Sequence, residues 1–327
     1  MAHRLTNRLA HRAVQMPFGR AGRRGVAAAA AIALLAGGLP ARAEGVLERI
    51  ARSGELVLTG YPSLPPLLTL DAKGQAQGYA VVVAERIAAE LSRAVGRPVA
   101  LRFAPVADNA TPFSTIAAGK ADLACGFPFS WAGDMQIDHS LAIGLSGLRL
   151  LAPSGRFDGS PAGLAGRSIG VVRASLGEGQ LQGMQPKAKV VPFNDLVAAV
   201  TALQAGEVDG VIGDSIVLAG QVQSRGLQGL ILTPELPYEV YGVSCLVPAD
   251  ASTYRHLVNL AIVRLLQGYL ERDPQAVAAV DRWLGPGRGV GIPQARLDAI
   301  FEGVLIGVET IRLVPEASAE AARPQTP

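Results

Sequence analysis

The chain has 327 residues, of which 49% are hydrophobic and 17% charged, and its formal net charge is +3. It contains two cysteines, too few for a disulfide-framework protein. The basic excess lies in the first 43 residues, which carry seven arginines and no acidic residue; subtracting those seven from the 30 Lys and Arg leaves 23 against 27 Asp and Glu, a net charge of −4. The rest of the chain is therefore acidic, which excludes an argument for nucleic-acid binding from charge.

Residues 1–43 have the organisation of a secretory signal peptide. A basic stretch precedes the apolar run of residues 25–40, and Ala41-Arg42-Ala43 predicts cleavage before Glu44. The apolar run is shorter than the roughly 20 residues that span a bilayer, which argues against a membrane anchor. Arg23-Arg24 keeps twin-arginine export open beside the ordinary secretory route. We expect a periplasmic protein that is soluble, globular and without a membrane span once the signal is removed.

Helical and extended patterns alternate in the first part of the remaining chain. Helices are predicted at 46–52, 79–91 and 113–118, and apolar strands at 56–59, 99–103 and 122–126. Residues 61–66 are rich in proline and predict a loop that cannot continue a sheet. Gly119 is placed to end the third helix. The aromatic residues 127–131 then follow the third strand as a loop.

The same alternation continues to residue 247, and the chain ends in helices. Strands are predicted at 168–172, 189–193, 210–214, 231–233 and 240–247, and helices from Ser175, at 195–205, 252–272, 274–284 and 293–313. The run at 240–247 is too apolar for a linker, so we expect it to return as a strand to the first part of the fold. Residues 314–327, rich in Ala, Glu and Pro, are expected to be disordered.

Two segments of the chain are alike. Residues 116–126 and 203–213 both show a helix, a glycine, two further residues, an aspartate and an apolar strand, with Asp122 and Asp209 in equivalent places. Residues 54–60 and 166–172 show a similar correspondence. The repeat predicts two α/β lobes built on one plan, each with a mostly parallel sheet flanked by helices.

The order of elements over roughly residues 46–284 resembles the periplasmic solute-binding proteins of ABC uptake systems. The match is to the polar amino-acid-binding family, bacterial extracellular solute-binding family 3. The segments that carry it are GELVL (54–58), GY (78–79), AGKAD (118–122), IDHS (137–140), GRSIGV (166–171), GEVDGVIGD (206–214) and DRWL (281–284).

This resemblance implies a type II periplasmic-binding-protein fold, in which two α/β lobes are joined by two crossover strands. Lobe 1 would comprise residues 44–142 and 238–313, and lobe 2 residues 143–237. The crossings would fall at 140–146 and 236–242, with hinge closure on a ligand between the lobes. The third strand and the returning strand would be neighbours, so Cys125 and Cys245 could form a bridge; two buried thiols are the alternative.

The ligand chemistry departs from the family. Its α-amino-acid binders hold the ligand carboxylate with an arginine shortly after the third strand, and here Gly133 or Asp134 stands at that position. Ala80 and Val82 replace the acids usual after the Gly-aromatic pair. Asp214 remains at the position that receives the ligand's amino group. The resemblance therefore implies a small ligand other than a standard α-amino acid.

Several residues are candidates for ligand contact. Tyr61, Phe127, Phe129 and Trp131 would offer a stacking surface, or would pack the loops that carry them. Ser130 and Ser175 are placed for hydrogen bonds, although Ser175 also suits an ordinary helix N-cap.

Two further side chains have a functional and a structural interpretation. Arg173 could supply positive charge, or could be a solvated surface residue. His139, beside the first crossing, could tune closure with pH, or could be a hydrogen-bonded structural residue.

The sequence favours a monomeric binder over an enzyme, without catalytic residues, metal or cofactor. It lacks a nucleophile elbow, a metal-spaced His pair, a CxxC pair and a Walker-type loop. One partner class is an ABC permease. The Phe-Ser-Trp sequence at 129–131, Asp134-Met135 and the helix beyond Trp283 support an alternative. They resemble the orphan GrrP-like binding proteins that accompany a secreted Gly-rich peptide and a radical SAM maturase. The enzymatic alternative is a dehydratase or lyase on the same fold, with Asp134, Asp138 or Asp214 as acid or base.

Overall fold

The computed structural model describes residues 45–107, 110–129, 136–287 and 290–307. The signal peptide predicted at 1–43 and the tail predicted at 314–327 lie outside these residues. The helices are α2 (Val46–Ser53), α3 (Tyr79–Val95), α4 (Pro112–Ala117), α6 (Leu176–Met184), α7 (Leu196–Gln204), α8 (Ser215–Ser224), α9 (Ser252–Leu270), α10 (Pro274–Asp281) and α11 (Gln294–Ile306). The strands are β1 (Glu55–Gly60), β2 (Ser63–Leu64), β3 (Leu68–Leu70), β4 (Ala76–Gln77), β5 (Ala100–Pro105), β6 (Ala124–Pro128), β7 (Asp138–Pro153), β8 (Ser168–Val172), β9 (Lys189–Phe193), β10 (Gly210–Asp214), β11 (Leu230–Thr233) and β12 (Glu239–Val247).

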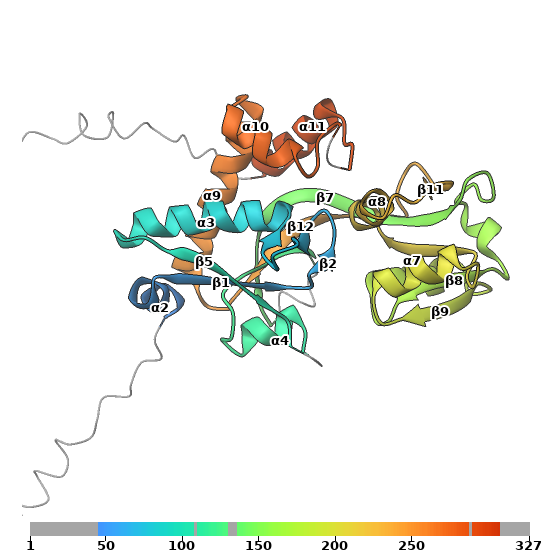
Figure 1. Cartoon of the computed structure of the whole chain (residues 1–327), viewed down its shortest axis with the longest axis horizontal. Helices are drawn as coiled ribbons and strands as arrows, with labels where there is room; N and C mark the ends of the chain where they lie inside the picture. Colours follow the sequence, from blue (N-terminus) through green and yellow to red (C-terminus); the bar gives the residue numbers. More distant parts are fainter. Residues whose placement is uncertain (1–44, 108–109, 130–135, 288–289, 308–327) are drawn as a thin grey trace, which may run out of the picture. The chain divides into compact units, whose positions relative to one another are not determined.

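The first lobe is built on β1, β5 and β6. β1 is parallel to β5, and a parallel bridge between Leu58 and Leu123 brings β6 to the other side of β1. Helices α3 and α9 pack against each other beside these strands, as Figure 1 shows. Their apolar faces form a large core with residues such as Leu58, Ile87 and Leu266, while α4 contributes Ile116 to a smaller core.

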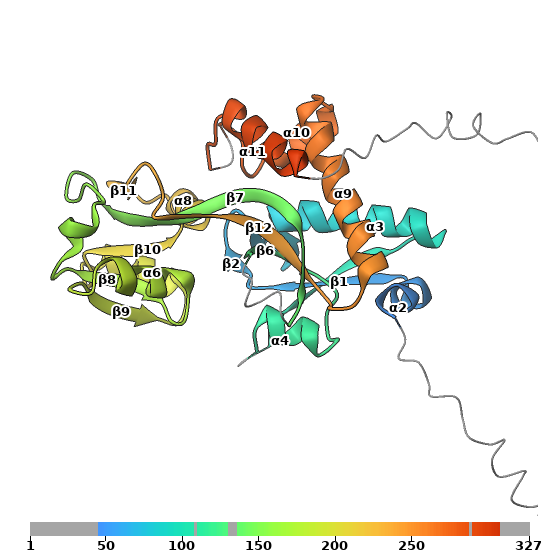
Figure 2. The same cartoon turned by 180° about the vertical axis from the view of Figure 1, so that it is seen from behind.

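The second lobe repeats this arrangement with β8, β9 and β10. β8 lies between β9 and β10 and is parallel to both. Helices α6 and α7 contact these strands, and Figure 2 shows the same group from behind. Ile169, Val171 and Ile212 belong to one buried cluster, whereas Val211 faces the large core. The alternation of apolar side chains along each strand therefore fills both faces of the sheet.

Two long strands connect the lobes. β12 is antiparallel to β6 in the first lobe and to β7 along most of its length. β7 continues into the second lobe, where it is antiparallel to β10 and β11. The crossings predicted at 140–146 and 236–242 are thus largely a pair of antiparallel strands, β7 and β12.

Three expectations need correction. The predicted parallel pairing holds for three strands of each lobe, but the sheet is mixed because β7 and β12 run antiparallel to their neighbours. The loop predicted at 61–66 contains β2, which pairs with β3 in a separate small sheet and not with β1. Phe127 and Pro128, predicted to lie in a loop, are the last residues of β6 and pair with β12.

The internal repeat has a physical basis in its two aspartates. Asp122 exchanges two hydrogen bonds with the backbone of Val57, through its N–H and its carboxylate, and its carboxylate also pairs with Arg49. Asp209 makes the same two backbone bonds with Ser168 and pairs with Arg156 at 2.6 Å. Each aspartate therefore ties the loop before a strand to the neighbouring parallel strand.

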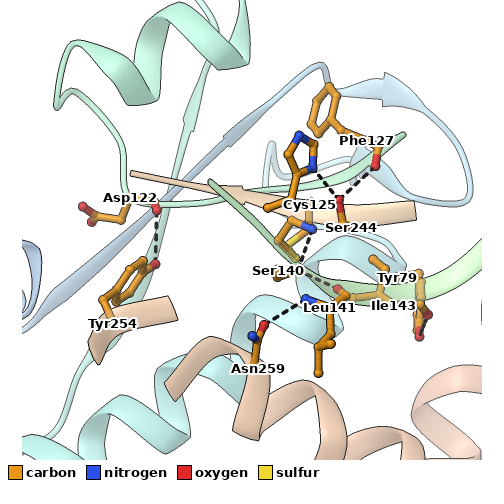
Figure 3. Close-up of a disulfide and its surroundings, with 12 residues drawn as sticks. Tyr79, Asp122, Cys125, Phe127, Ser140, Leu141, Ile143, Ser244, Tyr254 and Asn259 are labelled. Carbon is orange, nitrogen blue, oxygen red and sulfur yellow. Dashed lines mark hydrogen bonds between the residues drawn. A yellow bond between two sulfur atoms is a disulfide. The ribbon is translucent and has the colours of Figure 1, made fainter. Parts of the chain in front are cut away.

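The two cysteines form a disulfide, which resolves the alternative that the sequence left open. Cys125 on β6 and Cys245 on β12 are cross-strand partners, and both are buried. Figure 3 shows that the bridge lies beside Ser140, Ser244 and the segment of β7 that enters the crossing. The disulfide therefore fixes the returning strand to the first lobe.

The C-terminal helix α11 packs against α9 and β7. Leu297 and Phe301 are buried, and the Phe301 ring lies edge-on to Tyr269, with centroids 5.1 Å apart. Arg272 donates hydrogen bonds from Nη1 and Nη2 to the two carboxylate oxygens of Asp298. The helix predicted at 293–313 is thus part of the core in its described portion, and not an appendage.

Candidate ligand-binding site

The predicted site residue with the densest contacts is Asp214, at the junction of β10 and α8. Its Oδ1 accepts hydrogen bonds from the N–H groups of Ile216, at 2.9 Å, and Val217, at 3.0 Å, so it is the N-cap of α8. Its Oδ2 accepts a hydrogen bond from the Tyr241 hydroxyl at 2.8 Å. Ser146 also hydrogen-bonds to this carboxyl, and its hydroxyl lies 3.3 Å from that of Ser215.

The electrostatics of this cluster follow from its removal from water. Burial raises the pKa of the Asp214 carboxyl above its ordinary value, and the hydrogen bonds from Val217, Tyr241, Ser146 and Ile216 oppose that rise. Burial, together with the nearby Asp214 charge, also raises the pKa of the Tyr241 hydroxyl. Tyr241 is therefore protonated at neutral pH and able to donate its hydrogen bond.

Tyr241 and Ser146 come from the two crossing strands and are direct cross-strand partners. Sequence reasoning placed the crossings but did not single out these residues. The available signal was the polar pair in otherwise apolar crossing segments, where Leu145 and Val240 are neighbours. The pairing register brings the two hydroxyls to one face, and a register cannot be read from the sequence of one strand.

The described aromatic candidates lie in the first lobe. Tyr61 follows β1 and is 37% exposed, and burial of part of its ring raises its pKa. Phe127 packs against the core that includes Val57 and Leu246. Phe129 donates its N–H to the Gly242 carbonyl at 3.0 Å, and its ring lies edge-on to His139 at 5.0 Å. Both phenylalanines thus contribute to packing of the lobe, and stacking on a ligand stays a prediction.

The second-lobe candidates lie at the start of α6. Ser175 is the N-cap, and its hydroxyl accepts a hydrogen bond from the Glu178 N–H at 3.3 Å, as the N-cap alternative predicted. The Glu178 carboxylate accepts from the Ala174 N–H at 2.6 Å. Arg173 is exposed and donates its backbone N–H to the Phe193 carbonyl. A carboxylate of the chain itself therefore already lies at this helix terminus.

His139 lies in the first lobe at the start of the crossing. Its Nδ1 is 2.8 Å from the Ser244 hydroxyl, and the rings of Phe113 and Phe129 lie edge-on to its ring. It is buried at 6% exposure. This arrangement agrees with the hydrogen-bonded structural alternative.

The same part of β7 is attached to the first lobe by side chains. The pairing of β7 with β12 is irregular near Ile143 and Leu141, and there the Tyr79 hydroxyl donates to the Ile143 carbonyl and Asn259 accepts from the Leu141 N–H. Figure 3 shows these contacts around the disulfide. The first-lobe half of the crossing is therefore held in place by several independent bonds.

Some of the predicted site residues belong to one hydrogen-bonded network, and others lie outside the residues that the structure describes. Asp214 and Phe129 are connected through neighbouring residues of β12, Tyr241 and Gly242. Ser130, Trp131, Gly133 and Asp134 lie outside the described residues. Within the described ranges, no group of three or more His, Cys, Asp or Glu could hold a metal ion, and no helix is long and apolar enough to cross a membrane.

A separate pocket of about 430 Å³ is lined by none of the predicted site residues. Its walls come from the second lobe and the segment before α11, and they comprise Leu151, Ala219, Val222, Gln223, Leu230, Leu232, Gly287, Val290 and Gly291. We place the candidate site at Asp214 because several polar groups converge on its carboxylate, whereas Gln223 supplies the one polar side chain among the residues that line this pocket.

Solved structures provide a comparison for this architecture, whereas no family model and no curated protein sequence matches the chain. An arginine-binding protein from T. maritima is 17% identical, with a TM-score of 0.60, over 72% of this chain and 98% of that one. An ancestral amino-acid-binding protein described as a precursor of cyclohexadienyl dehydratase is 18% identical, with a TM-score of 0.62, over 73% and 99%. A solute receptor for L-cysteine from Neisseria gonorrhoeae is 18% identical, with a TM-score of 0.62, over 73% and 93%.

These similarities establish the fold. The chain has the type II periplasmic-binding-protein fold, with two α/β lobes joined by two crossover strands, as the sequence predicted. At sequence identities of 17% and 18%, the ligands of these neighbours cannot be assigned to this chain.

Proposed function

We propose that this protein is a periplasmic substrate-binding protein that captures a small ligand between its lobes by hinge closure. The observation that carries the proposal is the position of Asp214. Its carboxylate lies at the β10–α8 junction of the second lobe and is hydrogen-bonded to both crossing strands. A ligand group bound there would touch the second lobe and the hinge together. A solved structure of this fold, described as the substrate-binding protein of an amino acid ABC transporter, supports a transport role with an ABC permease as partner.

The charges favour a ligand with an amine or guanidinium group and no free carboxylate. The sequence has Gly133 or Asp134 where the resembling family has its carboxylate-binding arginine. At the start of α6, the Glu178 carboxylate already accepts a backbone hydrogen bond, so a ligand carboxylate there would meet a like charge. Asp214 supplies the opposite preference, because a carboxylate attracts a cation.

Arginine and agmatine provide a matched test, because agmatine is arginine without its carboxylate. We expect agmatine to raise the free energy of unfolding by about 2.7 kcal/mol at 100 times its Kd. Arginine at the same concentration should stabilise the protein much less. The measurement is urea unfolding of the protein lacking residues 1–43, with and without each compound. Equal or greater stabilisation by arginine would show that a carboxylate is accommodated and that our assignment of ligand charge is wrong.

Two alternatives have observations in their favour. The first is a dehydratase on the same fold, which is supported by the neighbour described as a precursor of cyclohexadienyl dehydratase. Turnover of prephenate-like acids by the purified protein would show catalysis and refute a pure binding role. An orphan protein that serves a secreted Gly-rich peptide is favoured by the resemblance of the Phe-Ser-Trp sequence at 129–131 and of Asp134-Met135 to the GrrP-like proteins. Permease and ATPase genes beside the gene for this chain would contradict that alternative.

A further inference from the structure

We infer that Tyr241 is a positioning residue that holds the Asp214 carboxylate against the hinge, so that occupation of Asp214 changes the stability of the hinge. The inference rests on the proposed function, since it concerns the same site. It adds a role for a residue that contacts the aspartate and belongs to a crossing strand. The hydroxyl of Tyr241 would thereby connect ligand recognition to lobe closure.

The first step is the location of the flexible part of the crossing. β12 pairs with β6 only as far as Val243, and β7 pairs with β10 only from Leu148. Among the described strands, residues 145–147 and 240–242 therefore pair only with each other. Outside this pairing, the backbone bond that the described residues make to the ribbon runs from the Phe129 N–H to the Gly242 carbonyl. A ribbon of two strands is the weakest part of a sheet, so bending should concentrate there.

The second step is that the Asp214 cluster lies against this ribbon. Tyr241 and Ser146 are paired across it, and both hydrogen-bond to the carboxyl of Asp214. The other oxygen of Asp214 caps α8. One carboxylate thus connects the start of a second-lobe helix with both strands of the ribbon.

The third step is competition for Oδ2. A cationic group of a ligand would bind the same oxygen that accepts the hydrogen bond from the Tyr241 hydroxyl. Hydrogen bonds to a charged acceptor are roughly twice as strong as neutral ones, so sharing or losing this bond would alter the ribbon. If Asp214 were only a structural N-cap, its bonds from Ile216 and Val217 would be sufficient. Those bonds use Oδ1, so competition for Oδ2 leaves them unchanged.

The test compares Tyr241→Phe with Tyr238→Phe in the ligand-free protein. Both tyrosines are half-buried and donate a hydrogen bond of 2.8 Å, but Tyr238 donates to the Gly159 carbonyl, away from the ribbon. We expect Tyr241→Phe to speed amide hydrogen exchange at residues 145–147 at least tenfold, because a bond to a charged acceptor is lost. Tyr238→Phe should leave those amides unchanged. Unchanged exchange in Tyr241→Phe, or equal effects of the two variants, would overturn the inference.

A second variant covers the case in which Tyr241→Phe does not fold. Asp214→Asn can keep the cap of α8 through its amide oxygen, and it removes the charge that Tyr241 binds. It should also speed exchange at residues 145–147, whereas unchanged exchange would contradict the inference.

The coupling to binding is tested with spin labels on the two lobes and agmatine as the probe. Agmatine should shorten the interlobe distance in the parent protein, and Tyr241→Phe should change both that distance and the Kd, unlike Tyr238→Phe. An unchanged distance and Kd in Tyr241→Phe would refute the coupling. No agmatine response in the parent protein would refute the proposed ligand class, while the exchange measurements would still decide the role of Tyr241.

Discussion

Asp214 combines three demands on one side chain. It caps α8, it accepts hydrogen bonds from hydroxyl groups on two strands, and its burial is sufficient to raise its pKa. Several hydrogen bonds to a carboxylate normally lower its pKa, so the rise shows that the desolvation cost is larger than their combined effect. A carboxylate held at such a cost is a common feature of functional sites.

The raised pKa of Asp214 predicts a pH dependence. A group whose pKa is higher in the folded state contributes stability below its unfolded pKa, here near the ordinary value of 3.8, and that contribution is lost as pH rises through the folded pKa. The free energy of unfolding of the parent protein should therefore fall relative to that of Asp214→Asn as pH increases above about 4. Urea unfolding of both proteins between pH 3.5 and 7 measures the difference. If the parent protein instead became more stable relative to Asp214→Asn as pH rises, the hydrogen bonds to the carboxylate would outweigh its desolvation.

At the residue scale, the sequence predicted those roles that depend on local chemistry. Ser175 is an N-cap because its hydroxyl needs only the N–H three residues on, and Gly119 has the positive φ of 67° that a helix-ending glycine adopts. Tyr241 and Ser146 were not predicted, because their shared partner Asp214 depends on the register of two strands. The disulfide was left open for the same reason.

At the element scale, α8 makes a contact between the lobes that the crossings do not provide. Gln221 donates its side-chain N–H to the Ser63 carbonyl at 2.9 Å, and Gln221 is buried at 3% exposure. A Cβ atom added at Gly220 would lie 2.1 Å from the Pro65 carbonyl oxygen. Glycine is therefore required where the helix backbone of the second lobe meets the segment around β2 in the first.

The close approach at Gly220 predicts the effect of a single methyl group. Gly220→Ala should lower the free energy of unfolding by about 1–3 kcal/mol, because the helix or the Pro65 segment must move apart. The matched control is Gly183→Ala in α6, where a Cβ would have no heavy atom within 4 Å. That change should stabilise the protein by up to about 1 kcal/mol through helix propensity. Urea unfolding measures both changes. Similar stabilisation by the two substitutions would contradict the close approach of Gly220 to the Pro65 carbonyl.

Elements with their own periodic pattern were predicted well, and those defined by partners were not. β8 and β9 have the predicted bounds, since each is an apolar strand between polar segments. β2 is only two residues long and is a strand because Ser63 and Leu64 meet β3. The antiparallel direction of β7 and β12 likewise follows from the return of the chain between lobes, which no single segment records.

At the scale of the whole molecule, the buried apolar side chains do not divide at the hinge. The largest cluster includes Leu58 and Leu91 of the first lobe, Leu203 and Val211 of the second, and Leu151 of β7. Smaller clusters occupy the opposite face of each sheet. The lobes are therefore connected by continuous packing as well as by two strands, and loss of either lobe would expose apolar surface of the other.

This continuity predicts a single cooperative unfolding transition. Lobes joined only by strands would melt separately, whereas lobes that share a core lose burial together, because each apolar side chain contributes about 1.5–3 kcal/mol only while its partners remain packed. Scanning calorimetry of the protein lacking residues 1–43 should show one peak, with a van't Hoff enthalpy equal to the calorimetric enthalpy. The disulfide joins β6 to β12 within the first lobe, so it does not itself cross-link the two lobes in this measurement. Two resolved peaks, or a van't Hoff enthalpy near half the calorimetric value, would show that the packing across the hinge is too weak to couple the lobes.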